Sequence, residues 1–520
     1  MKVKKKFKMG KRTVESEYSY IPFRYIMALL IMAFEVVSVV AIVLALCYFV
    51  PYFYLAAWLT EIFCVLKIIS SDNNPEYKIP WLLVVLLLPV AGFMLYFMFY
   101  SRKLPKKLIK RLKLLRDKDY SYDDSCLLSD LANEDKHAMT QALQLKNIAD
   151  AHIFDGGREE YFPLGKDKHK RLLEDLKSAE RFIFMEYFIV EEGEFWNSIL
   201  DILKEKAKAG VEVRVVYDDV GCMMTLPGNY YDVLAKYGIK AVPFSPLRGN
   251  ADGEFNNRSH RKIAVIDGKV GYTGGINLAD EYIGAVKKFG FWKDVAIRIE
   301  GRAVWELTRL FLTDYGISAR DFPEDIHYYY PENETRGKGY IIPFGDGPHP
   351  MYDVRVGKSV IMSMLDSATD YFYITSPYLI IDHSLCEHIE MAARRGVDVR
   401  IIVPHIPDRK IVFELTQSFY PRLIRAGVRI YEYEPGFIHA KTYLADDKAA
   451  MIGTINLDYR SLVHHFECGA WMYGTEIIED IRRDIDKTLE KCIEIRMEDT
   501  EVGLPRQLLR QVLRAFATLF

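Results

Sequence analysis

An internal repeat constrains the fold of this 520-residue chain more than any other feature. Four segments occur twice in the same order, and the second copies follow the first at offsets of 179 to 189 residues. Because the offsets change so little, only small insertions separate the copies. The paired segments are Leu176–Val190 with Leu365–Ile380, Ala209–Asp218 with Arg395–Pro404, Tyr237–Phe244 with Ala426–Tyr433, and His260–Asn277 with His439–Asn456.

Each copy alternates amphipathic helical patterns with short strands rich in β-branched residues. In Ala209–Asp218 and Arg395–Pro404, for example, a helix-ending glycine is followed directly by such a strand. This alternation predicts an α/β fold with a mixed sheet in each copy. Two such units can pack about a pseudo-twofold axis, and a site between them would take equivalent residues from each unit.

The N-terminal part of the chain is the most apolar. Trp81–Ser101 is a 21-residue stretch without a charge, which is long enough to cross a bilayer. Tyr25–Val50 is apolar except for Glu35, and Phe53–Ser70 is a weaker run with two charges. The region is too long and too repetitive for a secretory signal peptide. We therefore predict up to three membrane helices, near residues 25–49, 52–70 and 79–100.

Charge is unevenly distributed, although the formal net charge is only −2. A near-neutral chain argues against a nucleic-acid-binding protein, which would usually be basic overall. Residues 2–12 carry seven Lys and Arg, and residues 102–118 carry nine. Basic flanks favour the cytoplasmic side of a membrane. We therefore expect a multi-pass protein of the cell membrane with a cytoplasmic catalytic part, one apolar run re-entering or lying in the interface, and contact with anionic lipid.

The C-terminal stretch Leu504–Phe520 has apolar residues at helical spacing and a row of three arginines, Arg506, Arg510 and Arg514. Such a helix lies either on an anionic membrane or against the catalytic body. Together these features divide the chain into five parts. They are an N-terminal membrane anchor with basic flanks (1–118), a first α/β unit (119–330), a connector rich in Gly, Pro and charge (331–352), a second α/β unit (353–502), and the amphipathic C-terminal helix (503–520).

Each copy of the repeat ends in the motif His-x-Lys-x4-Asp. Because side chains repeat every two residues along a strand, the His and Lys of one motif lie on the same face. In both copies an asparagine follows the lysine by 15 positions, after a turn of small residues. The candidate catalytic residues are His260, Lys262, Asp267, His439, Lys441 and Asp446, supported by Asn277 and Asn456. We expect the two aspartates to lie off the pocket and to pair with structural groups.

This set of residues suits phosphoryl transfer. A neutral histidine can attack phosphorus to form a phosphohistidine, while a second, protonated histidine donates a proton to the leaving alkoxide. The lysines would offset charge on the nonbridging oxygens. The chemistry needs no metal and no cofactor, and no cluster has metal-ligand spacing. Seven scattered cysteines without a CxxC pair indicate a reducing compartment rather than a disulfide framework.

The doubled motif resembles the phospholipase D superfamily, and from about residue 25 onward the chain resembles the bacterial cardiolipin synthases of the phospholipase D type. The resemblance implies N-terminal membrane helices followed by two phospholipase D-type α/β units. It also implies that two phosphatidylglycerol molecules, one donor and one acceptor, are converted to cardiolipin and glycerol. The segments that carry it are Asn74–Phe99, Phe291–Gly301 (FWKDVAIRIEG), Gly436–Asp447 (GFIHAKTYLADD) and Ile452–Ser461 (IGTINLDYRS).

The resemblance further implies roles for individual residues. His260 would be the nucleophile and His439 the general acid, with Glu467 and Asp294 as acids behind the histidines. A surface or interstrand salt bridge is the alternative for each acid. The chain departs from the family pattern at Val463–Trp471 (VHHFECGAW), where apolar or Asn residues would be expected in place of the two histidines.

Three other functions remain alternatives. A hydrolytic phospholipase D would use the same residues with water as the acceptor. A nuclease with the same doubled motif would have a basic groove and no membrane helices. A non-catalytic membrane scaffold would not need intact His, Lys and Asn in both copies. The sequence does not indicate an oligomeric state or the preferred acceptor.

Overall fold

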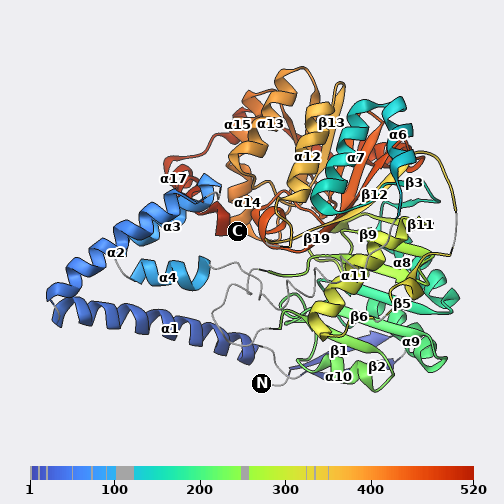
Figure 1. Cartoon of the computed structure of the whole chain (residues 1–520), viewed down its shortest axis with the longest axis horizontal. Helices are drawn as coiled ribbons and strands as arrows, with labels where there is room; N and C mark the ends of the chain where they lie inside the picture. The colour runs from blue at the N-terminus through green and yellow to red at the C-terminus, as the bar shows by residue number, and fades with distance from the viewer. Residues whose placement is uncertain are drawn as a thin grey trace.

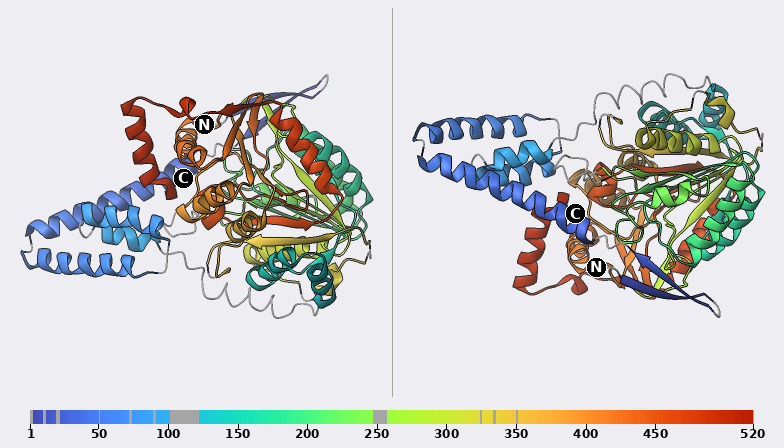
Figure 2. Two further views of the ribbon diagram at one scale, coloured as in Figure 1. Left: turned by 90° about the horizontal axis from the view of Figure 1, so that it is seen from above. Right: turned by 90° about the horizontal axis from the view of Figure 1, so that it is seen from below.

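Two α/β units stack with their sheets facing each other, and the N-terminal helices project from one side of them (Figures 1 and 2). The structure is a computed structural model of the whole chain. It describes residues 3–9, 12–18, 22–49, 51–71, 74–88, 91–100, 122–246, 257–323, 325–332, 335–349 and 351–519. The predicted basic stretch 102–118 lies outside the described residues.

The first unit contains a seven-stranded sheet in the order β4-β11-β9-β8-β5-β6-β7. Strands β5, β6 and β7 are parallel, whereas β8, β9, β11 and β4 follow as antiparallel neighbours. Every residue of β5 is buried, as expected for a central strand covered on both faces. The strands are β4 (Glu160–Phe162), β5 (Phe182–Tyr187), β6 (Glu212–Asp218), β7 (Lys240–Phe244), β8 (Lys262–Ile266), β9 (Val270–Gly274) and β11 (Ala296–Glu300).

The second unit repeats this arrangement in a nine-stranded sheet, β20-β15-β14-β13-β17-β18-β19-β12-β3. Its central strands have the same relative directions as their counterparts in the first sheet. The prediction of a mixed α/β fold in two repeats is confirmed. The strands are β3 (Phe154–Asp155), β12 (Tyr340–Asp346), β13 (Tyr371–Thr375), β14 (Asp398–Pro404), β15 (Arg429–Tyr433), β17 (Thr442–Ala445), β18 (Ala449–Gly453), β19 (Glu467–Tyr473) and β20 (Cys492–Ile495).

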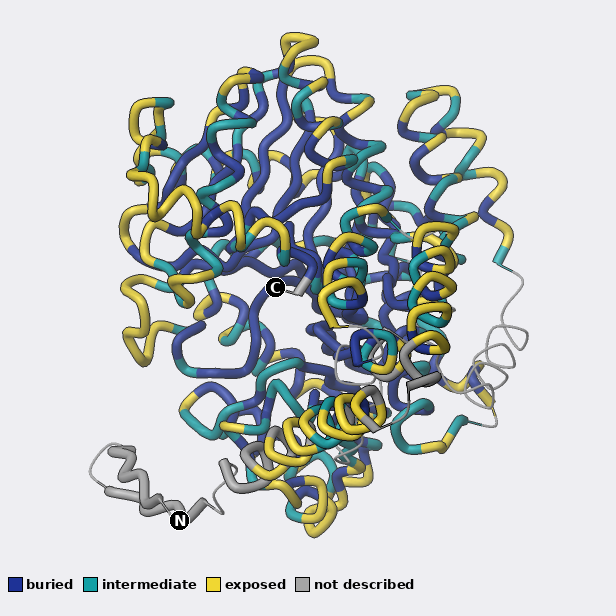
Figure 3. Tube along the Cα trace, turned by 90° about the vertical axis from the view of Figure 1, so that its left-hand side faces the viewer, coloured by how far each residue is buried: buried dark blue, intermediate teal, exposed yellow. Residues whose placement is uncertain are grey.

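Three apolar cores hold these layers together, and the buried strands run through the centre of the molecule (Figure 3). One core lies under α8 (Gly165–Ser178) and α9 (Glu194–Lys208) on the first sheet. Another lies under α12 (Val356–Ser367) and α13 (His383–Arg394) on the second sheet. The shared core between the sheets includes α11 (Val304–Ala319) and residues of α16 (Ile477–Leu489). This shared core fixes how the two units face each other.

Two predicted boundaries are corrected by the packing. Helices α6 (Ser125–Glu134) and α7 (Lys136–Ala149) and strand β3 belong with the second sheet, although they lie within 119–330. Residues of α7 join the core formed by β12, α12 and β19, because its apolar face is complementary to that side of the sheet. The predicted connector 331–352 contains β12, which is buried throughout and pairs with β19 along its whole length.

The N-terminal apolar region forms four helices rather than three. The first two predicted segments correspond to α1 (Pro22–Phe49) and α2 (Pro51–Ile69). The third is divided into α3 (Pro75–Leu87) and α4 (Ala91–Tyr100). Pro89 in the sequence explains the division, since proline disfavours a helical conformation in the residue before it. No helix within the described part of the chain combines the length and the apolar character needed to cross a membrane.

Two peripheral helices dock on the second unit. At the start of α3, the Asn74 amide donates to Asp382 at 2.7 Å, and Glu76 accepts from the backbone of His383 at 2.8 Å. The C-terminal helix α17 (Leu504–Ala515) contacts α14 (Lys410–Gln417) and α3. A short antiparallel pair, β1 (Val3–Met9) and β2 (Arg12–Tyr18), precedes α1. The remaining α-helices among the described residues are α10 (Tyr230–Ala235) and α15 (Tyr420–Arg425).

Candidate active site

The two histidines of the repeated motif lie where the units meet. His260 lies two residues before the start of β8, and its backbone N–H donates to the carbonyl of Phe466 in the second unit at 2.8 Å. His439 follows the short strand β16 (Gly436–Ile438), which pairs in parallel with β10 (Phe291–Lys293) of the first unit. Its N–H donates to the carbonyl of Lys293 at 2.7 Å. Each histidine is therefore held by backbone of the opposite unit.

Each histidine also contacts a carboxylate that belongs to the other unit. His260 Nδ1 lies 2.9 and 3.0 Å from the two carboxylate oxygens of Glu467, which belongs to the second unit. His439 Nδ1 lies 2.6 Å from Oδ2 of Asp294, which belongs to the first unit. Thr454 donates a further hydrogen bond to Glu467. In both pairs the carboxylate contacts Nδ1, so Nε2 is the ring nitrogen that the acid does not engage.

Both lysines of the motifs are completely buried beside their histidines. Lys262 Nζ donates to the carbonyl of His260 at 2.5 Å, and Lys441 Nζ lies 2.8 Å from His439 Nδ1. Burial lowers the pKa of Lys262 to about 7 and that of Lys441 to about 8, against an attraction from the site's carboxylates. Two ammonium groups so close together and so poorly solvated favour an anion as the ligand.

Burial shifts the histidines and the acids in opposite directions. The pKa values of His260 and His439 fall well below 6.5, first because of desolvation and then because of the neighbouring lysines. Desolvation raises the pKa of Asp294 to about 6 and that of Glu467 to about 7, although the lysines oppose the rise. The lowered pKa values favour neutral imidazoles at both histidines in the resting site.

The motif aspartates lie away from this group, at the far end of their strands. Asp267 accepts hydrogen bonds of 2.7 to 2.9 Å from three consecutive backbone N–H groups, those of residues 180–182. Asp446 does the same with residues 369–371. Each carboxylate fixes the turn that leads into a central strand. Asp267 and Asp446 thus lie off the histidines and bind structural groups, so we propose a structural rather than a catalytic role for both.

The two asparagines are not equivalent. Asn277 donates to the hydroxyl of Tyr282 at 2.7 Å, and its side-chain oxygen accepts from the backbone of Ile189. Asn456 donates to Asp458 at 2.9 Å, and its side-chain oxygen has no hydrogen-bond partner among the described residues. Both asparagines are buried in the part of each unit that follows β9 or β18.

Several side chains around the histidines were not predicted. Tyr282, Trp292 and Phe437 surround His439, with ring centroids 5.7 to 5.9 Å from the imidazole. Phe188 and His465 pack against His260, at 5.1 and 5.6 Å. The only sequence signal for any of them was the departure from the family pattern at His465. Trp292 and Phe437 lie on the short strands β10 and β16, and Phe188 and Tyr282 lie in loops, so their meeting at the histidines depends on tertiary packing.

One group in the described residues could offer ligands to a metal ion. It consists of His260, His465 and Glu467, whose candidate ligand atoms lie within 4.8 Å of one another. Two imidazoles and a carboxylate are a donor set that zinc accepts. However, Lys262 and Arg258 face the same group, and their charges oppose a dication and favour an anion.

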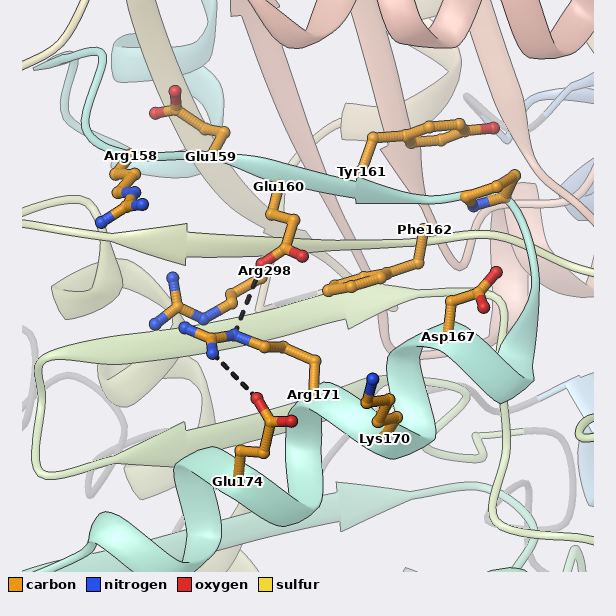
Figure 4. Close-up of a pocket in the computed structure, with 11 residues that line it drawn as sticks. Arg158, Glu159, Glu160, Tyr161, Phe162, Asp167, Lys170, Arg171, Glu174 and Arg298 are labelled. Carbon is orange, nitrogen blue, oxygen red and sulfur yellow. Dashed lines mark hydrogen bonds and ion pairs between the residues drawn. The ribbon is translucent and has the colours of Figure 1, made fainter.

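A charged cavity lies apart from the histidines, between β4 and α8 (Figure 4). None of the motif residues lines it. Its side chains largely neutralise one another: Arg171 pairs with Glu174 at 3.0 Å and lies 3.5 Å from Glu160. We assign this cavity no part in the chemistry of the histidines.

Comparison with known proteins identifies the family. The family described as "Cardiolipin synthase, PLD-like domain" matches residues 172–288 and 361–489, one stretch in each unit, and the "Phospholipase D-nuclease N-terminal" family matches residues 62–99. A curated cardiolipin synthase of Halalkalibacterium halodurans is 34% identical over 447 residues, covering 85% of this chain and 88% of that protein. The chain belongs to the bacterial cardiolipin synthase family of the phospholipase D superfamily.

Two further comparisons also extend over most of this cardiolipin synthase family member. An uncharacterized protein of Streptococcus mutans is 42% identical over 434 residues, 82% of this chain and 93% of that protein. The crystal structure of a phosphatidylserine synthase from Haemophilus influenzae matches with a TM-score of 0.55 at 15% identity, covering 74% of this chain and 98% of that chain. At that identity the likeness shows a shared fold.

Proposed function

We propose that this protein is a cardiolipin synthase that transfers the phosphatidyl group of one phosphatidylglycerol to a second, releasing glycerol. The observation that carries the proposal is the pair of crossed His–carboxylate contacts beside two buried lysines, in a chain whose curated relatives are named cardiolipin synthases. Two imidazoles, each held by its carboxylate at Nδ1, provide the nucleophile and the proton donor of a two-step transfer through Nε2.

In the first step, Nε2 of His260 attacks the phosphorus of phosphatidylglycerol. An N–P bond forms, the bond from phosphorus to the headgroup glycerol oxygen breaks, and Nε2–H of His439 gives its proton to that oxygen. Glu467 holds the proton of His260 on Nδ1 and offsets the positive charge that the ring gains on phosphorylation. Lys262 and Lys441 offset the charge on the nonbridging oxygens.

In the second step, neutral His439 removes the proton from a hydroxyl of the second phosphatidylglycerol. That oxygen attacks the phosphohistidine, the P–N bond breaks, and cardiolipin forms while His260 returns to its neutral state. The same imidazole thus serves as acid and then as base. Lipid as the acceptor, rather than water, is part of the proposal and distinguishes it from a hydrolytic phospholipase D.

The depressed pKa of His439 has to be reconciled with a role as acid. In the empty site, desolvation and two lysines favour its neutral form. A phosphodiester bound between the lysines adds a negative charge that offsets theirs, which raises the pKa of the imidazole. We therefore infer that His439 takes up its proton as the substrate binds, with Asp294 stabilising the imidazolium at 2.6 Å.

We further propose that the protein acts at the cell membrane, with its catalytic body on the cytoplasmic side. The support is the apolar N-terminal sequence and the large apolar side chains that α2 leaves exposed, including Leu55, Phe63 and Leu66 at 58 to 64%. Anionic phosphatidylglycerol would then reach the site from the lipid surface.

Helix α17 supports the same placement in an unexpected way. Its basic row faces the body, because Arg506 and Arg510 both bind Glu414. Its apolar row faces outward, with Leu504 and Leu508 80% and 60% exposed. We propose that this apolar row, rather than the arginines, enters the lipid surface.

Trapping of the intermediate tests the proposed chemistry. Enzyme mixed with phosphatidylglycerol labelled in the phosphatidyl group and quenched in acid should retain label, because the phosphohistidine is covalent. His260→Ala should retain none, whereas His439→Ala should still bind label at a reduced rate. Label retained by His260→Ala and absent from His439→Ala would reverse the two roles, and no label in any variant would exclude a covalent route.

A further inference from the structure

His465 is a third imidazole beside the proposed nucleophile. Its ring centroid lies 5.6 Å from that of His260, and the side chain is only 8% exposed. A five-residue π-helix, Arg460–His464, ends immediately before it, and the N–H of His465 donates back to the carbonyl of Arg460 at 2.8 Å. Irregular helical turns of this kind are frequent at functional sites.

The position of its Nδ1 is the informative feature. This buried nitrogen has no hydrogen-bond partner among the described residues, and it lies 3.8 Å from Oε1 of Glu467. That oxygen is the one that contacts His260 Nδ1 at 2.9 Å. A buried polar atom without a partner is costly, and a ring movement of less than about 1 Å would bring it to hydrogen-bond distance of the carboxylate.

The segment around His465 is anchored firmly enough to make such a contact specific. The N–H of Phe466 donates to the carbonyl of Arg258 at 2.9 Å, and the N–H of His260 donates to the carbonyl of Phe466 at 2.8 Å. Residues 465–467 therefore run beside residues 258–260 in fixed register. Hydrogen bonds that matter in catalysis are often long in a free enzyme and shorten when substrate is bound.

We propose that His465 is a positioning residue for the nucleophile: its Nδ1–H donates to Glu467, keeps that carboxylate ionised, and so holds His260 in the tautomer whose Nε2 is unprotonated. A protonated Glu467 would instead donate to Nδ1 of His260 and leave the only ring proton on Nε2, where it blocks attack. The inference rests on the proposed role of His260.

Other charged groups also act on Glu467 and have to be considered. Lys262 and Lys441 favour its ionised form, and Asp458 opposes it. Desolvation, and then the positive groups that it faces, lower the pKa of His465, so its ring is kept neutral and can donate without carrying charge. The groups that face His465 are His260, Arg460, Lys262 and Arg258.

The half of the site around His439 has no equivalent of His465 among the described residues. No third imidazole contacts Asp294 among the described residues, and His439 is instead enclosed by aromatic rings. The preceding residue, His464, points elsewhere and lies 3.4 Å from the hydroxyl of Tyr77 on α3. His464 is therefore a matched control, being a buried histidine one position away whose ring packs against Tyr77 on α3.

The test is the pH dependence of kcat/KM for full-length enzyme acting on phosphatidylglycerol in detergent micelles. His465→Phe keeps a ring but no donor, His465→Leu is a second variant without a donor, and His465→Gln restores an N–H. On the acid side of the profile, where kcat/KM falls as the pH is lowered (the acid limb), we expect the midpoint to rise by about one pH unit in the Phe and Leu variants. A lost hydrogen bond to a charged group changes a pKa by about that amount. Above that limb, kcat/KM should return to within about twofold of wild type.

The Gln variant and His464→Phe should both keep the wild-type acid limb. An unchanged limb in folded His465→Phe or His465→Leu would overturn the inference, as would a Gln variant that behaves like the Phe variant. An equal shift in His464→Phe would also overturn it, because the effect would then be general. The labelling experiment distinguishes failure of this inference from failure of the proposed function. If acid-quenched wild-type enzyme carries no label at His260, the proposed function itself is wrong. If it carries label but the pH profiles of the His465 variants are unshifted, only the role of His465 is wrong.

Discussion

At the scale of single residues, each motif histidine depends on a carboxylate of the other unit. Glu467→Gln keeps the size of the side chain but removes the charge that orients His260 across the interface. We expect turnover to fall by about 10²–10⁴, as when an orienting carboxylate is neutralised in a comparable His–carboxylate pair. Single-turnover formation of the labelled enzyme measures this step, which should be slowed in parallel with turnover.

Asp267→Asn is the matched control, because it neutralises an equally buried carboxylate of the motif that binds only backbone N–H groups. We expect it to lower the free energy of unfolding by about 1–3 kcal/mol while leaving kcat of the folded protein within about twofold. A folded but inactive Asp267→Asn enzyme would return this aspartate to the catalytic group.

The lysines provide a second prediction. Lys262→Ala and Lys441→Ala should each lower kcat by about 10²–10³, the loss associated with one donor to a developing oxyanion. Arginine should not restore the rate, because its planar fork does not fit a site shaped for a compact ammonium group. Steady-state rates in micelles measure both effects, and near-wild-type turnover of either Ala variant would remove that lysine from the site.

The shifted pKa values predict a narrow pH optimum. Glu467 must be ionised, and its pKa is raised to about 7, so activity should fall as the pH drops through that value. Lys262 and Lys441 must be protonated, and their pKa values are lowered to about 7 and about 8, so activity should also fall as the pH rises through this range. A profile of kcat/KM should therefore be narrow and bell-shaped, with its maximum near pH 7. A flat profile from pH 5 to 10 would contradict both assignments.

At the scale of elements, the outward apolar row of α17 can be tested separately from catalysis. Leu508→Glu places a charge on that row without touching the arginines that bind Glu414. We expect weaker binding to phosphatidylglycerol vesicles in flotation assays and unchanged turnover on dispersed short-chain lipid. Leu143→Glu is the control, because Leu143 is a 40% exposed leucine on α7, away from the N-terminal helices (Figure 1). Equal losses in both variants would argue against a specific lipid-facing role for α17.

The duplicated α/β fold and the mixed sheet of each unit could be predicted from the sequence because they follow from local patterns that occur twice. The partner of each histidine could not. Whether Glu467 meets His260 or His439 depends on how the two sheets face each other, and that is set by the shared core around α11 and α16. Similarly, nothing in the sequence of the two-residue strand β3 shows that it joins the edge of the second sheet rather than the first.

The C-terminal helix shows the same limit. Its amphipathic pattern predicted one basic and one apolar face, and both exist. Which face meets the body depends on Glu414, a residue some 90 positions earlier with no motif around it. The proposed role of His465 was equally hidden, since His260, the residue that it would position, belongs to the first unit.

At the scale of the whole molecule, the account requires no metal ion. Enzyme treated with a chelator in detergent micelles should keep its rate, because the described site offsets substrate charge with Lys262 and Lys441. Addition of zinc should not activate, and occupancy of the His260, His465 and Glu467 set should inhibit by removing the nucleophile. A strict dependence that a divalent cation restores would mean that the cluster serves as a catalytic metal site.

The most direct measurement is the product analysis of purified full-length protein on vesicles that contain phosphatidylglycerol as the only reactive lipid. The account predicts cardiolipin and glycerol in equal amounts with little phosphatidic acid, because a lipid hydroxyl accepts the phosphatidyl group from His260. Phosphatidic acid as the main product would show that water is the acceptor. The synthase assignment would then be wrong, and the protein would be a hydrolytic phospholipase D.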